Sequence, residues 1–183
     1  MTAHPSPAYT QITHPHHLSP ALRAQLIGCW VAVSNAGGAV VSDRFPPPPV
    51  VFADVVPAAD HLVAGLAPDR SRLLLATVGE ALAGWLVVHR SAHPFIAHWG
   101  TLNHIQTHPA HRHRGIGAGL VRRVARLARD EMGLEQLHVA VRAGLGLEDF
   151  YRRLGWKETG RRPGALRVAP GDDRDEILMM ITL

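Results

Sequence analysis

Arginines and glycines are concentrated in one short segment, which reads Thr-His-Pro-Ala-His-Arg-His-Arg-Gly-Ile-Gly-Ala-Gly over residues 107–119. An apolar run precedes the segment and an amphipathic helical pattern follows it, so we expect a strand, a turn and the start of a helix. The first N–H groups of a helix lack internal partners and carry partial positive charge. Glycines let a phosphate approach these donors closely, and Arg112 and Arg114 add full charges. The segment predicts a phosphate-binding turn, and the alternative is a glycine turn used only for tight packing.

The spacing of the glycines restricts the phosphate ligand. A nucleotide P-loop ends in Gly-Lys-Ser or Gly-Lys-Thr, which this segment lacks, and the dinucleotide fingerprint places its third glycine elsewhere. The pattern Arg112-x-x-Gly115-x-Gly117 instead resembles the coenzyme A pyrophosphate loop of the GCN5-related N-acetyltransferase (GNAT) superfamily. The resemblance implies an enzyme that uses acetyl-CoA as its acetyl donor. It also implies that the donor is bound by Ile105, Gln106, Thr107, Arg112, His113, Arg114, Gly115, Ile116, Gly117, Ala118 and Gly119.

Two further segments extend the resemblance over about residues 98–160. Residues 137–141 look like the fifth strand of the family, and residues 148–156 resemble its Phe-Tyr-x-x-x-Gly-Phe segment. The resemblance implies that Tyr151 is the general acid that protonates the leaving thiolate; the alternative is a tyrosine that packs or only hydrogen-bonds the sulfur. Gly144 departs from the family pattern, because many members have asparagine there to hold the pantetheine part of the donor.

The sequence leaves the general base open. Many relatives carry glutamate on the fourth strand, where this chain has Thr101 and Asn103. His104 is the nearest titratable side chain, and an unperturbed pKa near 6.5 suits a base. His104 and Asn103 point to opposite faces of a regular strand unless a bulge intervenes. His138 on the neighbouring strand and a chain of water molecules are equal alternatives, and the pattern fits a structural sheet histidine as well.

The acceptor is predicted from a shorter similarity. Residues 160–177 are similar to antibiotic-inactivating acetyltransferases of the tabtoxin resistance type and to aminoglycoside 2′-N-acetyltransferases that act on kasugamycin. This similarity implies the primary amine of a small molecule, such as an aminoglycoside-type antibiotic, as the acceptor. Four acids would bind a cationic amine or form only a solvated turn, namely Asp172, Asp173, Asp175 and Glu176. Asn35 would line the acceptor pocket or only end the first predicted helix.

Two other functions are compatible with the sequence. An enzyme of the same fold that acetylates peptides or proteins needs an open groove, whereas the prolines at 46–49 and residues 163–175 look like covers over a small pocket. A nucleic-acid or anion-binding module would use the six arginines between residues 112 and 129, which no acid interrupts. Nucleic-acid sites usually interleave aromatics or present a broad basic face, and residues 115–132 contain no aromatic residue. We therefore expect no nucleic-acid partner.

The order of the apolar patterns predicts the fold class. Strands are expected at 9–12, 72–78, 82–89, 97–107, 136–142, 156–159 and 177–182, and helices at 20–33, 54–67, 115–132 and 147–154. This order is a mixed α/β (α+β) arrangement. The family resemblance implies one domain over residues 1–183, with a mostly antiparallel sheet of about seven strands, about four helices, and strands 4 and 5 splayed around the donor. Residues 1–8 are expected to be a loose tail, residues 9–97 to form the acceptor half and residues 98–183 the acetyl-CoA half.

The composition bears on thiol reactivity, metal binding and location in the cell. The 183 residues have a formal net charge of +4, and the single cysteine, Cys29, is expected to be a buried, unreactive thiol on an apolar helical face. The histidines at 104, 108, 111 and 113 lack the rigid spacing of a zinc site, so no metal is expected. No apolar run reaches the roughly 18 residues of a membrane helix, and the first residues do not resemble a secretory signal. We expect a cytoplasmic enzyme without a membrane partner, and a homodimer is compatible with the sequence.

Overall fold

The structure, a computed structural model, describes residues 6–38 and 45–183. These residues form two compact units: the first comprises the described residues up to 89 together with 103–124, and the second comprises 90–102 and 125–183. Strand β4 (Trp99–Thr107) and helix α3 (Ile116–Asp130) each contribute residues to both units. Residues 1–5 of the predicted tail lie outside the described residues, and Ala8 already begins the first strand.

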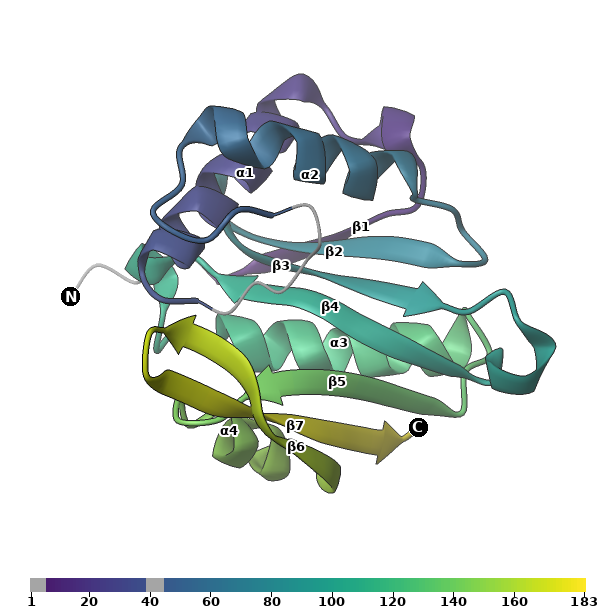
Figure 1. Ribbon diagram of the computed structural model, residues 1–183. Coiled ribbons are helices and arrows are strands. Elements are labelled where there is room, and N and C mark those ends of the chain that lie inside the picture. Colours follow the sequence, from purple (N-terminus) through teal and green to yellow (C-terminus); the bar gives the residue numbers. More distant parts are fainter. Residues whose placement is uncertain (1–5, 39–44) are drawn as a thin grey trace. The chain divides into compact units, whose positions relative to one another are not determined.

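The first unit is built from a hydrogen-bonded set of strands and the helices that follow β1 (Figure 1). Its elements are β1 (Ala8–Ile12), α1 (Pro20–Asn35), α2 (Phe52–Ala64), β2 (Ser71–Val78), β3 (Ala81–Arg90) without its last residue, the second part of β4, the first part of α3, and short 3-10 turns at Pro15–His17 and Pro109–His111. The strand order is β1-β2-β3-β4, and β2 pairs antiparallel with both β1 and β3. The predicted hairpin around Gly79 and Glu80 is present, because Val78 pairs with Ala81.

Helices α1 and α2 pack on one face of these strands. α1 begins after Ser19, whose hydroxyl accepts a hydrogen bond from the N–H of Leu22 at 3.2 Å, as expected of an N-cap. α2 begins two residues earlier than predicted, where the carboxylate of Asp54 accepts a hydrogen bond from the N–H of Val51 at 2.8 Å. Alternate strand residues face the helices, and burial of this apolar face holds the layers together. The core includes Leu26, Ile27, Trp30, Val55, Leu73, Leu75, Trp85 and Val87.

The first turns of α3 pack on the other face. Gly84 of β3 allows a close approach, since a Cβ atom there would lie 2.6 Å from the carbonyl oxygen of Gln106. Tyr9 of β1 reaches α3, and its hydroxyl occupies the space that a side chain at Gly119 would need. The guanidinium of Arg123 lies 4.2 Å from the centre of the Tyr9 ring. Tyr9 therefore joins the first strand to the first turn of α3.

We expect Gly119→Ala to destabilise the protein by about 1–3 kcal/mol, because the added methyl group overlaps the Tyr9 hydroxyl in a filled site. Urea unfolding followed by circular dichroism measures the change. Gly28→Ala in α1 is the matched control, since a Cβ atom there meets no atom within 4 Å and alanine favours a helix. Adding Tyr9→Phe should recover part of the loss. Equal stability of Gly119→Ala and the wild type would contradict this packing.

The second unit contains the remaining strands. Its elements are the first part of β4, the last part of α3, β5 (Gln136–Arg142), α4 (Leu147–Arg153), β6 (Lys157–Ala169), β7 (Asp172–Thr182) and a 3-10 turn at Pro94–Ile96. The strand order is β4-β5-β7-β6, with β4 parallel to β5 and the other two pairs antiparallel. The parallel ladder joins residues 99–101 to residues 136–138. The predicted splaying of β4 and β5 concerns residues of β4 that belong to the first unit, and it stays a prediction.

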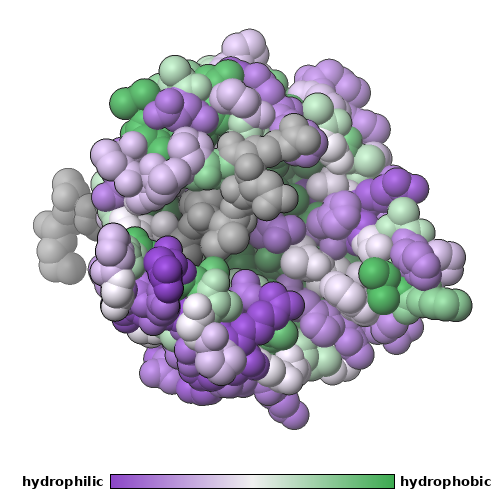
Figure 2. Space-filling view, viewed as in Figure 1, coloured by the Kyte–Doolittle hydropathy of each residue, from purple (hydrophilic) through white to green (hydrophobic). Residues whose placement is uncertain are grey.

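The β6–β7 hairpin is longer than the sequence predicts. The expected strands 156–159 and 177–182 form only part of it, and both strands continue through the segment interpreted as a cover. Most side chains of β6 are exposed, so this strand lacks the apolar alternation that reveals a half-buried strand. Hydrophilic residues gather over β6 and β7 on the face seen in Figure 2. Cross-strand pairs of arginines with carboxylates accompany the ladder.

The predicted fold class is confirmed. Within the described residues the chain has seven strands and four α-helices, with antiparallel pairing predominant and β4 parallel to β5. Apart from the hairpin, the predicted elements are present with ends displaced by at most a few residues. None of the helices in the described part of the chain is long and apolar enough to cross a membrane.

Candidate functional site

The glycine turn lies in the first unit and opens α3. β4 ends at Thr107, a 3-10 turn follows, and His113 and Gly115 adopt positive φ angles of 59° and 77°. The N–H of Gly119 donates to the carbonyl of Gly115 at 2.9 Å, which is the first helical hydrogen bond. Three N–H groups therefore have no partner within the helix, at its positive end: those of Ile116, Gly117 and Ala118.

The surroundings of this turn are electropositive. The guanidinium of Arg114 lies 3.3 Å from Nδ1 of His111. The pKa of His111 is lowered, first by burial and then by the charges of Arg114 and His108. Arg112, the residue after His111, adds a further positive charge. Burial alone would oppose any charge, but the two guanidinium groups attract an anion, so the turn fits a diphosphate.

Two local features are compatible with a ligand at the predicted donor site. A Cβ atom at Gly115 would meet no atom within 4 Å, so this glycine borders open space. Gln106, near the end of β4, is 2% exposed, and neither atom of its amide has a partner among the described residues. A buried amide without a partner is costly, and a ligand or water that bonds it would stabilise the site. Gly119 differs from the other two glycines of the turn. Its N–H donates a hydrogen bond within the helix, and its Cα faces Tyr9.

His104 stands at an irregularity in β4. Its φ is 55°, in the left-handed region that non-glycine residues rarely adopt within a strand, so regular alternation is interrupted here. Its ring lies beside two indoles, with ring centres 4.8 Å from Trp30 and 5.5 Å from Trp85. Burial lowers the pKa of His104 from 6.5 to about 4. The imidazole is therefore uncharged at neutral pH, and its unprotonated nitrogen can accept a hydrogen bond or a proton.

We expect His104 to make the protein about 2 kcal/mol less stable at pH 5 than at pH 7. The pKa of the imidazole is about 4 in the folded chain and near 6.5 in the unfolded chain, so the unfolded state binds the proton more tightly. The stability that depends on the uncharged imidazole is fully present above pH 6.5 and is lost as the pH falls towards 4. Chemical denaturation at several pH values measures it. His104→Asn, which tolerates positive φ, should flatten the slope; an unchanged slope would contradict a buried neutral imidazole.

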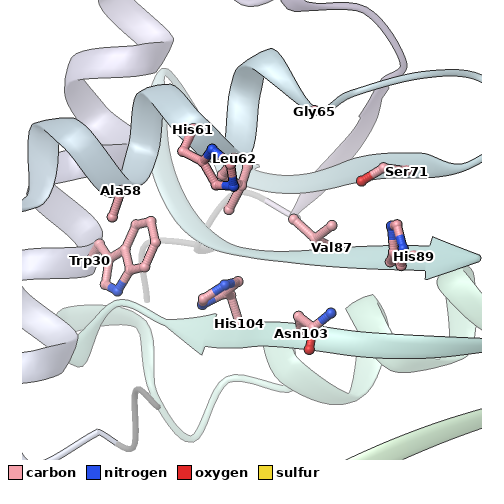
Figure 3. Close-up of a pocket in the computed structure, with 10 residues that line it drawn as sticks. All are labelled: Trp30, Ala58, His61, Leu62, Gly65, Ser71, Val87, His89, Asn103 and His104. Carbon is pink, nitrogen blue, oxygen red and sulfur yellow. The ribbon is translucent and has the colours of Figure 1, made fainter. Parts of the chain in front are cut away.

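A cavity of about 290 Å³ adjoins His104 (Figure 3). It lies within the first unit, and α1, α2, β2, β3 and β4 all contribute to it. Its lining mixes apolar with polar side chains and includes Trp30, Leu62, Val87, Ser71, His61, His89 and Asn103. Sequence reasoning identified only His104 as a site residue in this set, because no local pattern connects residues that come from five separate elements.

The predicted acceptor-binding residues have partners of their own. The side chain of Asn35 accepts a hydrogen bond from the N–H of Val50 at 2.8 Å and donates to its carbonyl at 2.9 Å. This pair ties the end of α1 to the segment before α2. Each predicted aspartate forms an ion pair in the second unit: Asp172 with Arg174, Asp173 with Arg167 and Asp175 with Arg161. The arginines balance these carboxylates, and a role for them in binding a cationic acceptor stays a prediction.

Tyr151 belongs to the second unit, where α4 follows β5. Its side chain is 2% exposed and packs edge-on against Phe150 and Trp156, with ring centres 5.1 Å and 5.2 Å away. Burial raises the pKa of the phenol above its usual value near 10. The group stays protonated at neutral pH, which is the state that a general acid needs. His138, the alternative base, lies on β5 of the same unit with its ring centre 4.5 Å from that of Trp99.

The departure from the family pattern at Gly144 has a local reason. Its φ is 86°, and a Cβ atom there would lie 2.5 Å from a guanidinium nitrogen of Arg174. Arg174 is itself paired with Asp172 on β7. A side chain at residue 144 would have to adopt a positive φ and move the end of the Arg174 side chain, which gives a local reason for a glycine there.

Cys29 is buried in α1, as predicted. It is 2% exposed, and burial raises the pKa of its thiol to about 12, so the reactive thiolate is scarce at neutral pH. In residues 6–38 and 45–183, no group of three or more His, Cys, Asp or Glu side chains is arranged to hold a metal ion.

The comparison with protein families identifies the enzyme class. The sequence model described as acetyltransferase (GNAT) family matches residues 39–156, more than half of the chain. The chain belongs to the GNAT family. GNAT enzymes use acetyl-CoA as the acetyl donor, so the predicted enzyme class and donor are confirmed. No curated protein matches the sequence significantly.

Three solved structures illustrate the similarity in fold. A GNAT acetyltransferase from Streptococcus pneumoniae has a TM-score of 0.73 and 16% identity, over 97% of this chain and 100% of that chain. A protein assigned as a phosphinothricin N-acetyltransferase has a TM-score of 0.72 and 19% identity, over 96% and 99%. A ribosomal-protein-alanine N-acetyltransferase from Brucella melitensis has a TM-score of 0.71 and 17% identity, over 96% and 99%. Such low identities establish the GNAT fold alone and leave the acceptor of this enzyme open.

Proposed function

We propose that this GNAT enzyme transfers the acetyl group directly to the primary amine of a small molecule. The cavity beside His104 carries the proposal, because its volume of about 290 Å³ is near the lower end of ordinary small-molecule pockets. The apolar part of the lining, which includes Leu62 and Val87, suits an apolar part of the acceptor, and an uncharged imidazole suits an amine that must be neutral to react. A peptide acceptor would need an extended groove.

The proposed chemistry is a direct displacement. Acetyl-CoA supplies the acetyl group as a thioester. The amine nitrogen forms the C–N bond at the carbonyl carbon, the C–S bond breaks, and the sulfur leaves with its electron pair. His104 accepts the proton that the nitrogen loses, and Tyr151 donates a proton to the thiolate. The N–H groups of residues 105–107 hydrogen-bond the carbonyl oxygen as its negative charge develops.

In this proposal the glycine turn holds the diphosphate of the donor. The unpartnered N–H groups at the start of α3 donate hydrogen bonds to the anion, which lies at the positive end of the helix dipole. Arg112 and Arg114 supply the charge, and the amide of Gln106 offers a further buried hydrogen-bonding group. Binding both substrates together makes a covalent enzyme intermediate unnecessary, because proximity replaces it.

An aminoglycoside-type antibiotic such as kasugamycin is the acceptor that the similarity of residues 160–177 implies. Acetylation of a primary amine would remove a cationic group and inactivate such a compound. Expression in a susceptible bacterium tests this part of the proposal. Growth at an otherwise inhibitory concentration supports it, and unchanged susceptibility with active enzyme in the cells would remove the antibiotic but not the small-molecule acceptor.

The proposed function is tested by substrate selection. Calorimetry measures acetyl-CoA binding, and free-thiol release measures turnover on a panel of amino sugars, amino acids, simple amines and peptides with free amino termini. We expect turnover with small amines and an N-acetylated product by mass spectrometry. Turnover confined to peptides would overturn the small-molecule acceptor and favour the protein-acetylating alternative.

A further inference from the structure

We infer that His61 and His89 recognise an acidic group on the acceptor, so that the acceptor carries a carboxylate or similar anion as well as its amine, and an aminoglycoside-type acceptor must then carry an acidic group too. The inference rests on the proposed function, since it concerns the cavity assigned to the acceptor. The inference rests on how the side chains are distributed around that cavity. Trp30 and His104 form its inner wall, and His61 and His89 lie at its edge.

The positions of the histidines give the acceptor a direction. His104 lies against the buried indole of Trp30, whereas His61 of α2 and His89 of β3 are exposed residues at the edge (Figure 3). An amine must reach the inner histidine to lose its proton. The remaining polar group of a small acceptor then lies near the two outer imidazoles and the amide of Asn103.

The charge of the lining selects the sign of that polar group. None of the described residues that line the cavity is an acid. Asp60 precedes His61 in the chain, but its carboxylate accepts a hydrogen bond from Arg23 at 2.8 Å and is thereby paired. An imidazole beside an anion takes up a proton and becomes a charge-assisted donor. A second ammonium group would find no acid in this lining, whereas an anion would accept hydrogen bonds from the two imidazoles and the amide of Asn103, so an anion is the better match.

Matched pairs of acceptors test the inference. α-, β- and γ-amino acids are compared with their amino amides, which have nearly the same size but no charge at the carboxyl end. We expect kcat/KM to be about tenfold higher for the acid, mainly through a lower KM, as for one charge-assisted hydrogen bond. Without recognition of the carboxylate, the amide would react faster than the acid. A carboxamide lowers the pKa of the neighbouring amine, so more of the amine is uncharged and reactive.

Substitutions assign the preference to the two histidines. His61→Gln and His89→Gln keep hydrogen-bonding groups but cannot become cationic, and each should bring the acid-to-amide ratio close to one. His61→Arg restores a cation and should restore the ratio. His16→Gln, at an exposed histidine in the turn Pro15–His17, is the matched control and should leave the ratio unchanged. A purely structural role for either histidine would lower turnover of both acceptors equally.

A binding measurement gives a reading that does not depend on turnover. N-acetyl amino acids, which resemble the product, should shift the imidazole NMR signals of His61 and His89, whereas N-acetyl amino amides should not. Equal or faster acetylation of the amides, or a ratio that neither variant changes, would overturn the inference alone. Binding of acetyl-CoA without acetylation of any small amine would instead overturn the proposed function.

Discussion

Replacing Gly117 with glutamate is expected to abolish acetyl-CoA binding while the protein remains folded. The residue is the second of α3, where its N–H is one of the donors that the proposed function assigns to the diphosphate. A carboxylate there stabilises the helix by interacting with its positive end, but it opposes the anion by charge and by bulk. We expect affinity to fall at least about 100-fold, or roughly 2.7 kcal/mol, measured by calorimetry with acetyl-CoA.

Two variants separate the causes of this effect. Gly117→Gln adds nearly the same bulk without charge and should lose less affinity. Arg126→Glu changes charge by a larger amount at an exposed position further along α3, where screening by salt should keep its effect within about threefold. Retained acetyl-CoA affinity in a folded Gly117→Glu protein would remove the turn from the donor site.

Replacing Tyr151 with phenylalanine is expected to lower kcat by about 100-fold, which lies within the usual range for loss of a general acid. The phenol is buried and its pKa is raised, so the wild-type enzyme holds it in the protonated form throughout the neutral range. Phenylalanine keeps the edge-on contacts with Phe150 and Trp156. Stability and acetyl-CoA affinity should therefore change little, and the loss should appear in turnover.

The other tyrosine of the chain provides the control for this substitution. Tyr9→Phe also removes one hydroxyl, but from a residue whose contacts are with α3. Single-turnover kinetics with each variant isolate the acetyl-transfer step. Comparable transfer rates for Tyr151→Phe and the wild type would remove the acid role and leave Tyr151 as a packing residue.

The sequence predicts the fold wherever apolar periodicity is strong, and the β6–β7 hairpin shows where this fails. Residues 160–169 contain two glycines and a proline and few side chains that become buried, so neither the period of a helix nor that of a strand is visible. Their strand structure depends on pairing with β7 and on arginine–carboxylate contacts across the hairpin. Such contacts join residues 6–14 positions apart and leave no signature in a short window.

The candidate site likewise has one part that the sequence predicts and one part that it does not. The glycine turn is visible in the sequence because the function proposed for it depends on backbone N–H groups and local charge, both of which follow from adjacent residues. The cavity was not visible, because His61 and His89 reach it from separate elements. The positive φ of His104 is also unpredictable from its type, since histidine seldom adopts it in a strand. The sequence predicts a donor contact at Gly119, which stays a prediction, and the contact with Tyr9 offers a structural reason for that glycine.

The contact between Tyr9 and Gly119 makes the amino-terminal strand a mechanical support for the turn more than a hundred residues later in the chain. An affinity tag or a proteolytic cut that frays β1 would loosen the start of α3. Such damage would be recorded in an assay as weakened coenzyme binding, although every residue of the turn was intact.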